Sequence, residues 1–296
     1  MVEKNMNVKS NINWFPGHMK KALNEMQKSV KIVDIVIELV DARAPIASSN
    51  PELVKIINNK PHLVILNKSD LADENKTKEF VKYYDNLGIN TFVCSVLQLD
   101  FKKLKAKCND ILKEKFAKER SKGLKPRPIR ALVCGIPNVG KSTFINKVAK
   151  RKIANVGNKP GVTKSQQMIK VDKDFELLDT PGVLWPKFED QNVARTLALI
   201  HTIKTEILPK TELVSYLISW LIKEYPNTLN KRYGEVEMMV NNEDDILKII
   251  SNIATNRGFI ISGNTLDIDR TIDVILKEFA DGMLGRFTLE EVKNNG

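Results

Sequence analysis

The sequence predicts an α/β fold, a mostly parallel β-sheet with helices on both faces, followed by a small all-helical domain. From residue 33 to about residue 190, short apolar, β-prone runs alternate with segments of helical periodicity. This alternation is typical of parallel strands joined by crossover helices. Beyond Trp185-Pro186 the periodicity is helical only. We therefore expect two domains, at residues 14–190 and 191–296, in a chain long enough to bury a core in each.

In the first part of the chain, the spacing of Met19, Leu23, Met26 and Val30 predicts a helix that begins near His18. Short, mostly apolar runs predict buried strands, and apolar residues that recur every three or four positions predict helices. The expected elements are then a strand at 33–40, a helix at 51–59, a strand at 62–66, a helix at 74–86, a strand at 91–94 and a helix from residue 101 to about 116.

The second part begins after residues 121–128, which contain Gly123, Pro126 and Pro128 and are typical of a linker. Residues 151–166 are polar and predict a loop. The expected elements are strands at 131–134, 168–171 and 175–178, a helix at 142–150, and tail helices at 191–205, 211–224, 243–256 and 268–281.

Composition limits the class of protein. No apolar run approaches the roughly 20 residues that a membrane span needs, and the polar start of the chain resembles no signal peptide. Cys94, Cys108 and Cys134 are scattered without a C-x-x-C pair. We expect a cytoplasmic protein that is not embedded in a membrane and has neither a disulfide framework nor a zinc site.

The net charge of +11 is unevenly distributed. Residues 206–296 hold 10 Lys and Arg against 15 Asp and Glu, whereas residues 102–130 hold 12 against 3. Such a basic excess favours a polyanionic partner, and in a cytoplasmic chain that partner is RNA. A solvated lysine-rich helix explains the same run equally well.

A glycine-rich turn stands between an expected strand and an expected helix, and it reads Gly135-Ile-Pro-Asn-Val-Gly-Lys-Ser-Thr143. Glycines at both ends let successive backbone N–H groups point inward, and the helix N-terminus adds positive potential, so this turn predicts a polyphosphate site. Lys141 is placed for the β- and γ-phosphates and the Ser142 hydroxyl for Mg²⁺. The residues expected to touch the nucleotide here are Asn138, Val139, Gly140, Lys141, Ser142 and Thr143.

A second group of polar residues follows the strand at 62–66, as Asn67-Lys-Ser-Asp70. The Asp70 carboxylate can accept hydrogen bonds from guanine N1–H and N2–H₂, which adenine lacks. Asn67 would tie this loop to the phosphate loop, and the Lys68 stem would lie along the purine. The alternative is an ordinary strand-end turn with a capping Asp. The expected base-reading residues are Asn67, Lys68, Ser69 and Asp70, with Ser95 and Val96, after the third strand, offering a backbone N–H to guanine O6.

The segment Asp179-Thr-Pro-Gly182 also ends a strand. Alone it predicts a turn. Behind a phosphate loop, Asp179 is placed to hold Mg²⁺ through water and the Gly182 N–H to contact a γ-phosphate. In the sequence, Thr163 lies between the phosphate loop and Asp179, where a mobile segment can cap the metal. Together with the loops above, these residues predict a guanine-nucleotide site.

The order of these motifs is the reverse of that in ordinary GTPases, where the phosphate loop comes first. Here the base-reading loop precedes the phosphate loop by more than sixty residues. A fold tolerates new termini when the old ones lie close together at the surface and a linker joins them. We therefore expect a circularly permuted P-loop GTPase domain, with residues 121–128 as the join.

The chain resembles the circularly permuted GTPases, and in particular the RbgA/YlqF type that assists assembly of the bacterial large ribosomal subunit. The resemblance lies in Trp14-Phe-Pro-Gly-His-Met19, Asp41-Ala-Arg-Ala-Pro45, Asn67-Lys-Ser-Asp70, the phosphate loop, Pro160-Gly-Val-Thr163 and Asp179-Thr-Pro-Gly182. It implies a ribosomal partner with its rRNA, an RNA-contacting helical tail, and K⁺-stimulated GTP hydrolysis with Asn138 as a K⁺ ligand. The net acidic tail departs from this pattern.

Water activation needs a separate residue. Many GTPases carry a water-orienting Gln directly after the glycine that corresponds to Gly182, but Val183 has neither donor nor acceptor. The resemblance nominates His18 as the catalytic residue that orients the water. The alternative is that His18 only caps the first helix.

The sequence thus predicts a Mg²⁺-dependent GTPase. The resemblance implies K⁺ as activator and a nucleotide state that governs docking on a maturing large ribosomal subunit. The second hypothesis is a GTP-responsive RNA-binding switch in which hydrolysis is incidental. The permuted small-subunit GTPases, with an OB-fold and a zinc module, are disfavoured because about 13 residues precede Trp14 and the tail contains no Cys.

Overall fold

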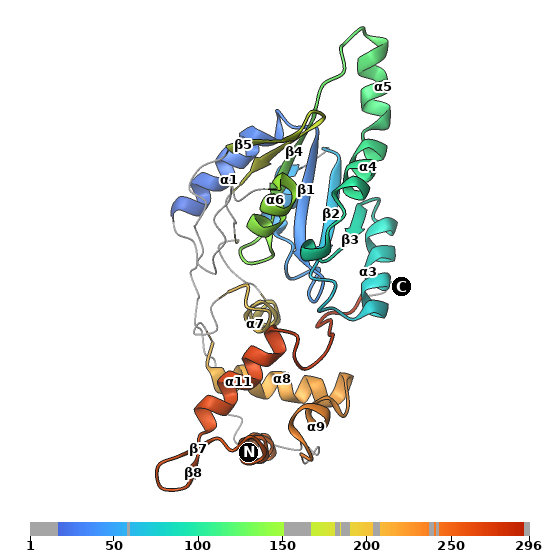
Figure 1. Ribbon diagram of the computed structural model, residues 1–296. Helices are drawn as coiled ribbons and strands as arrows, with labels where there is room; N and C mark the ends of the chain where they lie inside the picture. Colours follow the sequence, from blue (N-terminus) through green and yellow to red (C-terminus); the bar gives the residue numbers. More distant parts are fainter. Residues whose placement is uncertain are drawn as a thin grey trace, which may run out of the picture.

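The computed structural model (Figure 1) describes residues 17–57, 60–150, 167–180, 184, 190–203, 208–236, 240 and 243–292. Its larger part is a six-stranded sheet in the order β3-β2-β1-β4-β6-β5, parallel except for the edge strand β5. The strands are β1 (Ile35–Asp41), β2 (His62–Asn67), β3 (Asn90–Val93), β4 (Ile129–Cys134), β5 (Gln167–Asp172) and β6 (Phe175–Asp179). The predicted α/β class is confirmed.

Both faces of the sheet are covered by apolar side chains. Along β2, Val64 and Leu66 belong to a cluster with Phe80 of the helix α3 (Glu74–Asn86). The alternating residues Leu63 and Ile65 belong to the larger cluster on the other face. Because successive side chains of a strand point to opposite faces, every side chain in the middle of β2 is buried.

The helices of the sheet domain follow the predicted order, with one correction. They are α1 (Gly17–Val30), α2 (Pro51–Ile57), α3, α4 (Phe101–Ile111), α5 (Lys113–Ser121) and α6 (Lys141–Ala149).

The helix predicted from residue 101 to 116 is divided at Leu112. Leu104, Cys108 and Leu112 are buried, but no residue of α5 is, and α5 projects beyond the sheet (Figure 1). Phe116 of α5 is partly buried and still packs against the core, so the apolar stripe continues past the break although α5 buries no residue fully.

The tail contains α7 (Gln191–Leu199), α8 (Lys210–Glu224), α9 (Thr228–Tyr233), α10 (Glu243–Arg257) and α11 (Ile268–Ala280). It is not all-helical as predicted, because a hairpin joins β7 (Ile260–Ile261) to β8 (Thr265–Leu266). Gly263 and Asn264 both have positive φ in the turn between these strands, a conformation that Gly and Asn adopt most easily.

The tail packs against the sheet domain. Buried apolar side chains of both parts form one continuous cluster, from Val133 of β4 to Leu199 of α7 and Phe279 of α11. The predicted domain boundary at residue 190 therefore stays a prediction. Among the described residues, no helix is both long and apolar enough to cross a membrane.

Asp34 anchors the linker to the sheet. It is 3% exposed and accepts hydrogen bonds from both Nη atoms of Arg127, at 2.7 and 2.8 Å, and from Lys115 of α5. Burial alone would raise the pKa of Asp34, but these hydrogen bonds outweigh burial and hold the pKa below its ordinary value. The ionised form of Asp34 thus stabilises the join between the two halves of the permuted sheet.

We expect Asp34→Asn to lower the free energy of unfolding at pH 7 by about 2 kcal/mol, because Arg127 and Lys115 lose their charged partner. A carboxylate with a lowered folded-state pKa stabilises the fold above its unfolded pKa and loses that contribution as the pH falls further. The difference in the free energy of unfolding between wild type and variant, measured in urea, should therefore be smaller at pH 3 than at pH 7. The exposed Asp110→Asn on α4 is the matched control, and an equal cost for both variants would contradict the anchor.

Candidate functional site

The loop after β4 has the backbone of a phosphate-binding loop. Gly135 and Gly140 both have positive φ, at 142° and 100°. A Cβ on Gly135 would lie 2.5 Å from the Leu39 carbonyl oxygen, and one on Gly140 would lie 2.5 Å from the Asn67 Nδ2. Both positions therefore require glycine, and the helix α6 begins directly after them, as predicted.

Two charged side chains, Lys141 and Asp179, are buried near this loop. Lys141 is 8% exposed, and its Nζ donates to the Ile136 carbonyl at 2.7 Å. Burial lowers the pKa of Lys141 to about 8, against the opposing charge of Asp179. Burial likewise raises the pKa of Asp179, which is 6% exposed, to about 6. The Lys141 ammonium thus lies against the backbone of its own loop.

Asn67 joins the three loops at the carboxyl edge of the sheet, where open α/β sheets bind ligands. Its Nδ2 donates to the Val139 carbonyl of the phosphate loop at 2.7 Å, and its Oδ1 accepts from the Val96 N–H at 3.0 Å. The predicted tie between the base-reading loop and the phosphate loop is present. The Val96 N–H is thus already donated to Asn67. The predicted backbone contact of Ser95 and Val96 with guanine O6 stays a prediction.

The base-reading loop presents Asp70 to solvent, whereas Lys68 turns inward. Asp70 is exposed at the loop tip. Lys68 has a φ of 58°, and its Nζ lies 2.9 Å from Asp41 Oδ2. Ser69 is held by its N–H, which donates to the Cys94 carbonyl at 3.3 Å. The Lys68 ammonium is thus fixed by a partner that sequence reasoning did not identify.

That partner belongs to a buried ion pair. Asp41 is fully buried and accepts from Arg43 Nε at 3.0 Å and Nη2 at 2.8 Å. The remaining terminal nitrogen of Arg43, Nη1, donates to the Ala280 carbonyl of α11 at 2.7 Å. Sequence reasoning places residues 41–45 only in the family resemblance, although an Asp-x-Arg pair directly after a mostly apolar strand is a signal for this network.

Asn138 connects the phosphate loop to the tail. It has a φ of 59°, and its Nδ2 donates to the carbonyl of His201 at 3.0 Å and of Thr202 at 3.4 Å. Both acceptors follow the end of α7. The Asn138 Oδ1 is the atom that a cation would use, and the predicted K⁺ contact stays a prediction.

Several predicted site residues are not tested by the described geometry. Thr163 and Gly182 lie outside the described residues. His18 falls in the first turn of α1, and its side chain is not among those described. Ser142 and Thr143 are half-buried at the start of α6.

A magnesium site fits the donors present. Among the described residues, no three His, Cys, Asp or Glu side chains gather closely enough to form a metal cage. Mg²⁺ in nucleotide sites needs no such cage, because it takes one or two protein oxygens together with phosphates and water. The buried Asp179 carboxylate at the end of β6 and the Ser142 hydroxyl at the start of α6 are donors of this kind.

Comparison with known proteins gives consistent relatives. "Ribosome biogenesis GTPase A" of Bacillus cereus is 46% identical over 286 residues, which cover 96% of this chain and 95% of the relative. The chain belongs to the ribosome biogenesis GTPase A family. The mouse "Mitochondrial ribosome-associated GTPase 1" is 31% identical to it, with 94% of this chain and 89% of the mouse protein covered.

Membership of the ribosome biogenesis GTPase A family agrees with the matched family models and with the fold. The model described as "50S ribosome-binding GTPase" matches residues 130–252, and "RsgA GTPase" matches residues 30–189. The crystal structure of GNP-bound YlqF from T. maritima is 25% identical, with a TM-score of 0.64 over 92% of this chain and 99% of that chain. The predicted permutation is confirmed, because β2 and its base-reading loop precede β4 and the phosphate loop.

Proposed function

We propose that the protein is a GTPase that hydrolyses GTP to GDP and phosphate, and that its nucleotide state controls its action in assembly of the large ribosomal subunit. The observation that carries this proposal is the Asn67 side chain, which holds the phosphate loop and two base-side loops together at one edge of the sheet. The names of its relatives support the ribosomal role.

Each site residue has a role in this proposal. Asp70 reads guanine, with Ser95 at O6, and Lys141 neutralises the β- and γ-phosphates. Ser142, Thr163 and, through water, Asp179 hold Mg²⁺, which stabilises the charge that develops on the transferred phosphoryl group. The Gly182 N–H contacts the γ-phosphate.

His18 is proposed to position the attacking water. Val183 stands where many GTPases carry a water-orienting glutamine, and its side chain cannot form a hydrogen bond. An imidazole in the first turn of α1 supplies both a donor and an acceptor.

The deciding experiment measures GTP turnover by the full chain alone, with immature large-subunit particles, and with mature subunits. We expect the immature particles to stimulate turnover strongly. Nucleotide-dependent binding to particles without stimulated turnover would instead support the GTP-responsive RNA-binding switch. If the particles neither bind the protein nor stimulate its turnover, the ribosomal role is refuted.

We expect faster hydrolysis in KCl than in NaCl at equal ionic strength. Asn138 donates its Nδ2 to the tail, which leaves Oδ1 for a monovalent cation beside the phosphates. Asn138→Asp, which keeps an oxygen at this position, should retain part of the K⁺ effect, whereas Asn138→Ala should lose it. Equal turnover in both salts would contradict a cation site.

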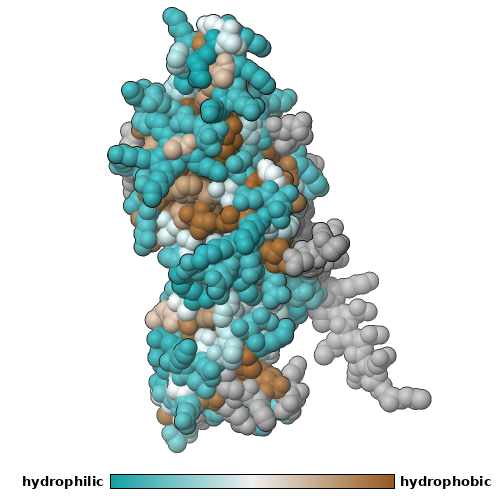
Figure 2. All heavy atoms as spheres, turned by 90° about the vertical axis from the view of Figure 1, so that its right-hand side faces the viewer, coloured by the Kyte–Doolittle hydropathy of each residue, from teal (hydrophilic) through white to brown (hydrophobic). Residues whose placement is uncertain are grey.

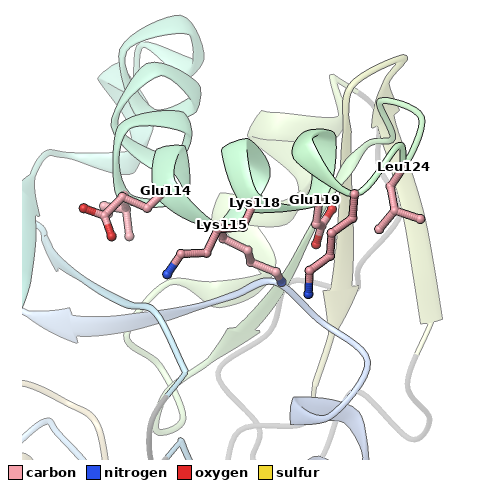
Figure 3. Close-up of a pocket in the computed structure, with 7 residues that line it drawn as sticks. Glu114, Lys115, Lys118, Glu119 and Leu124 are labelled. Atoms are coloured by element: carbon pink, nitrogen blue, oxygen red, sulfur yellow. The ribbon is translucent and has the colours of Figure 1, made fainter.

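The ribosome-facing surface is proposed to be the basic projection formed by α5 and the linker, residues 113–128. Its projecting end is largely hydrophilic (Figure 2). Lys118 and Lys122 form no ion pair with any described residue, and together with Lys115 and Glu119 they line a hollow of about 500 Å³ (Figure 3). Unpaired lysines on an element without a fully buried residue are available to RNA phosphates.

We expect the double variant Lys118→Glu, Lys122→Glu to bind large-subunit RNA about 10-fold more weakly at moderate salt. The slope of log affinity against log salt should fall by roughly 1.5 to 2, because each lost phosphate contact removes nearly one unit. The matched control, Lys82→Glu with Lys231→Glu, has the same charge change elsewhere. Equal losses in both double variants would point to net charge alone.

A further inference from the structure

The segment after α11 returns from the tail and lies against the base-reading loop (Figure 1). The Arg286 guanidinium donates through Nε to the Ala72 carbonyl at 2.8 Å and through Nη2 to the Ser69 carbonyl at 3.0 Å. The Phe287 N–H donates to the Leu71 carbonyl at 3.0 Å. Three consecutive contacts thus grip the backbone on both sides of Asp70.

The base-reading loop is also held by the Ser69 N–H, which donates to the Cys94 carbonyl, and by the Lys68 ammonium on Asp41. A hollow of about 310 Å³ separates it from α3, and both Ser69 and Arg286 line that hollow. Within the loop, the Leu71 N–H bonds back to the Lys68 carbonyl at 2.9 Å, which closes the turn but fixes it to nothing else. The orientation of Asp70 therefore depends on groups outside the loop.

Arg286 reaches the loop from a rigid support. The next residue, Phe287, is 4% exposed and stacks on Phe279 with ring centroids 5.5 Å apart. The Leu289 N–H donates to the Arg43 carbonyl at 2.8 Å. The Glu290 carboxylate accepts from two consecutive backbone N–H groups, those of residues 46 and 47, at 2.7 Å each.

We propose that Arg286 is a positioning residue for guanine recognition. It holds the carbonyls of Ser69 and Ala72 so that the carboxylate between them is presented to the base. The tail therefore completes the base site of the sheet domain, although the two are far apart in sequence. This role rests on the proposed assignment of Asp70 to guanine.

The test compares Arg286→Ala with wild type in titrations with GTP, GDP and inosine triphosphate, which lacks the 2-amino group that Asp70 would read. The loss of two hydrogen bonds should weaken GTP and GDP equally, by about 10-fold. The preference for GTP over inosine triphosphate should shrink several-fold, and kcat at saturating GTP should stay within about twofold, because the phosphate loop is untouched. Arg286→Lys, which keeps one donor, should be intermediate.

Arg195→Ala is the matched control, since Arg195 is a tail arginine that pairs with Glu212 and does not contact the loop. A variant that is less stable or binds weakly but keeps the wild-type preference for GTP would overturn the positioning role. Arg286→Lys provides the same comparison if Arg286→Ala does not fold. If wild type itself shows no preference for GTP over inosine triphosphate, the assignment of Asp70 fails, and the role of Arg286 fails with it.

Discussion

Asp70→Asn is expected to weaken GTP binding by about 100-fold and to create affinity for xanthosine triphosphate, since two hydrogen bonds to a charged acceptor are lost. In the proposed site the carboxylate would accept from both N1–H and N2–H₂ of guanine, whereas the amide would add a donor that faces the O2 of xanthine. Asp70 is exposed, so the fold should tolerate the change. Titration of both proteins with both nucleotides measures the exchange.

The control for this exchange is Asp85→Asn, which changes an exposed aspartate on α3. It should leave the preference for guanine intact. Unchanged GTP affinity in the Asp70 variant would remove Asp70 from the base site. If the variant binds neither GTP nor xanthosine triphosphate, the substitution has damaged the loop and has not exchanged one set of hydrogen bonds for the other.

Asp41→Ala is expected to cost about 3–5 kcal/mol of the free energy of unfolding, because it leaves the charge of Arg43 buried without its partner. Arg43 is 2% exposed. Burial alone would raise the pKa of Asp41, but the charges of Arg43 and Lys68 outweigh burial and hold that pKa far below its ordinary value. The same variant should release Lys68, and with it the base-reading loop.

Urea unfolding measures this cost, and a double variant tests its cause. Asp41→Ala combined with Arg43→Met removes both buried charges and should recover part of the lost stability. The exposed pair of Glu52 and Lys55 on α2 is the comparison, since Glu52→Ala should cost less than about 1 kcal/mol. A similarly small cost for Asp41→Ala would contradict a stabilising buried network.

The sheet was largely predictable because its central strands are short, mostly apolar runs. The boundaries of the strands predicted at 33–40 and 62–66 lie within one or two residues of those of β1 and β2. The sequence did not predict α9 or the hairpin of β7 and β8, whose strands of two residues are too short to show alternation. The break at Leu112 was also missed, because the apolar spacing continues through it to Phe116, which still packs against the core.

The site was predictable where its residues share a local motif. The phosphate loop and residues 67–70 each combine a strand end with a turn, and Asn67 joins them as expected. The contact of Arg43 with Ala280 and that of Arg286 with Ala72 were not predictable, because these partners lie 237 and 214 residues away in sequence. No periodicity or spacing encodes a hydrogen bond from one end of a chain to the other.

The contact from the Asn138 amide to the carbonyls after α7 makes the phosphate loop and the tail a thermodynamically linked pair. Suppose that a partner draws the end of α7 away from Asn138, and that filling the loop also disfavours this contact. Each event then favours the other by the same factor, because coupling between two binding equilibria is reciprocal. A surface that grips the tail would in that way set how firmly the loop holds its own ligands, without touching them.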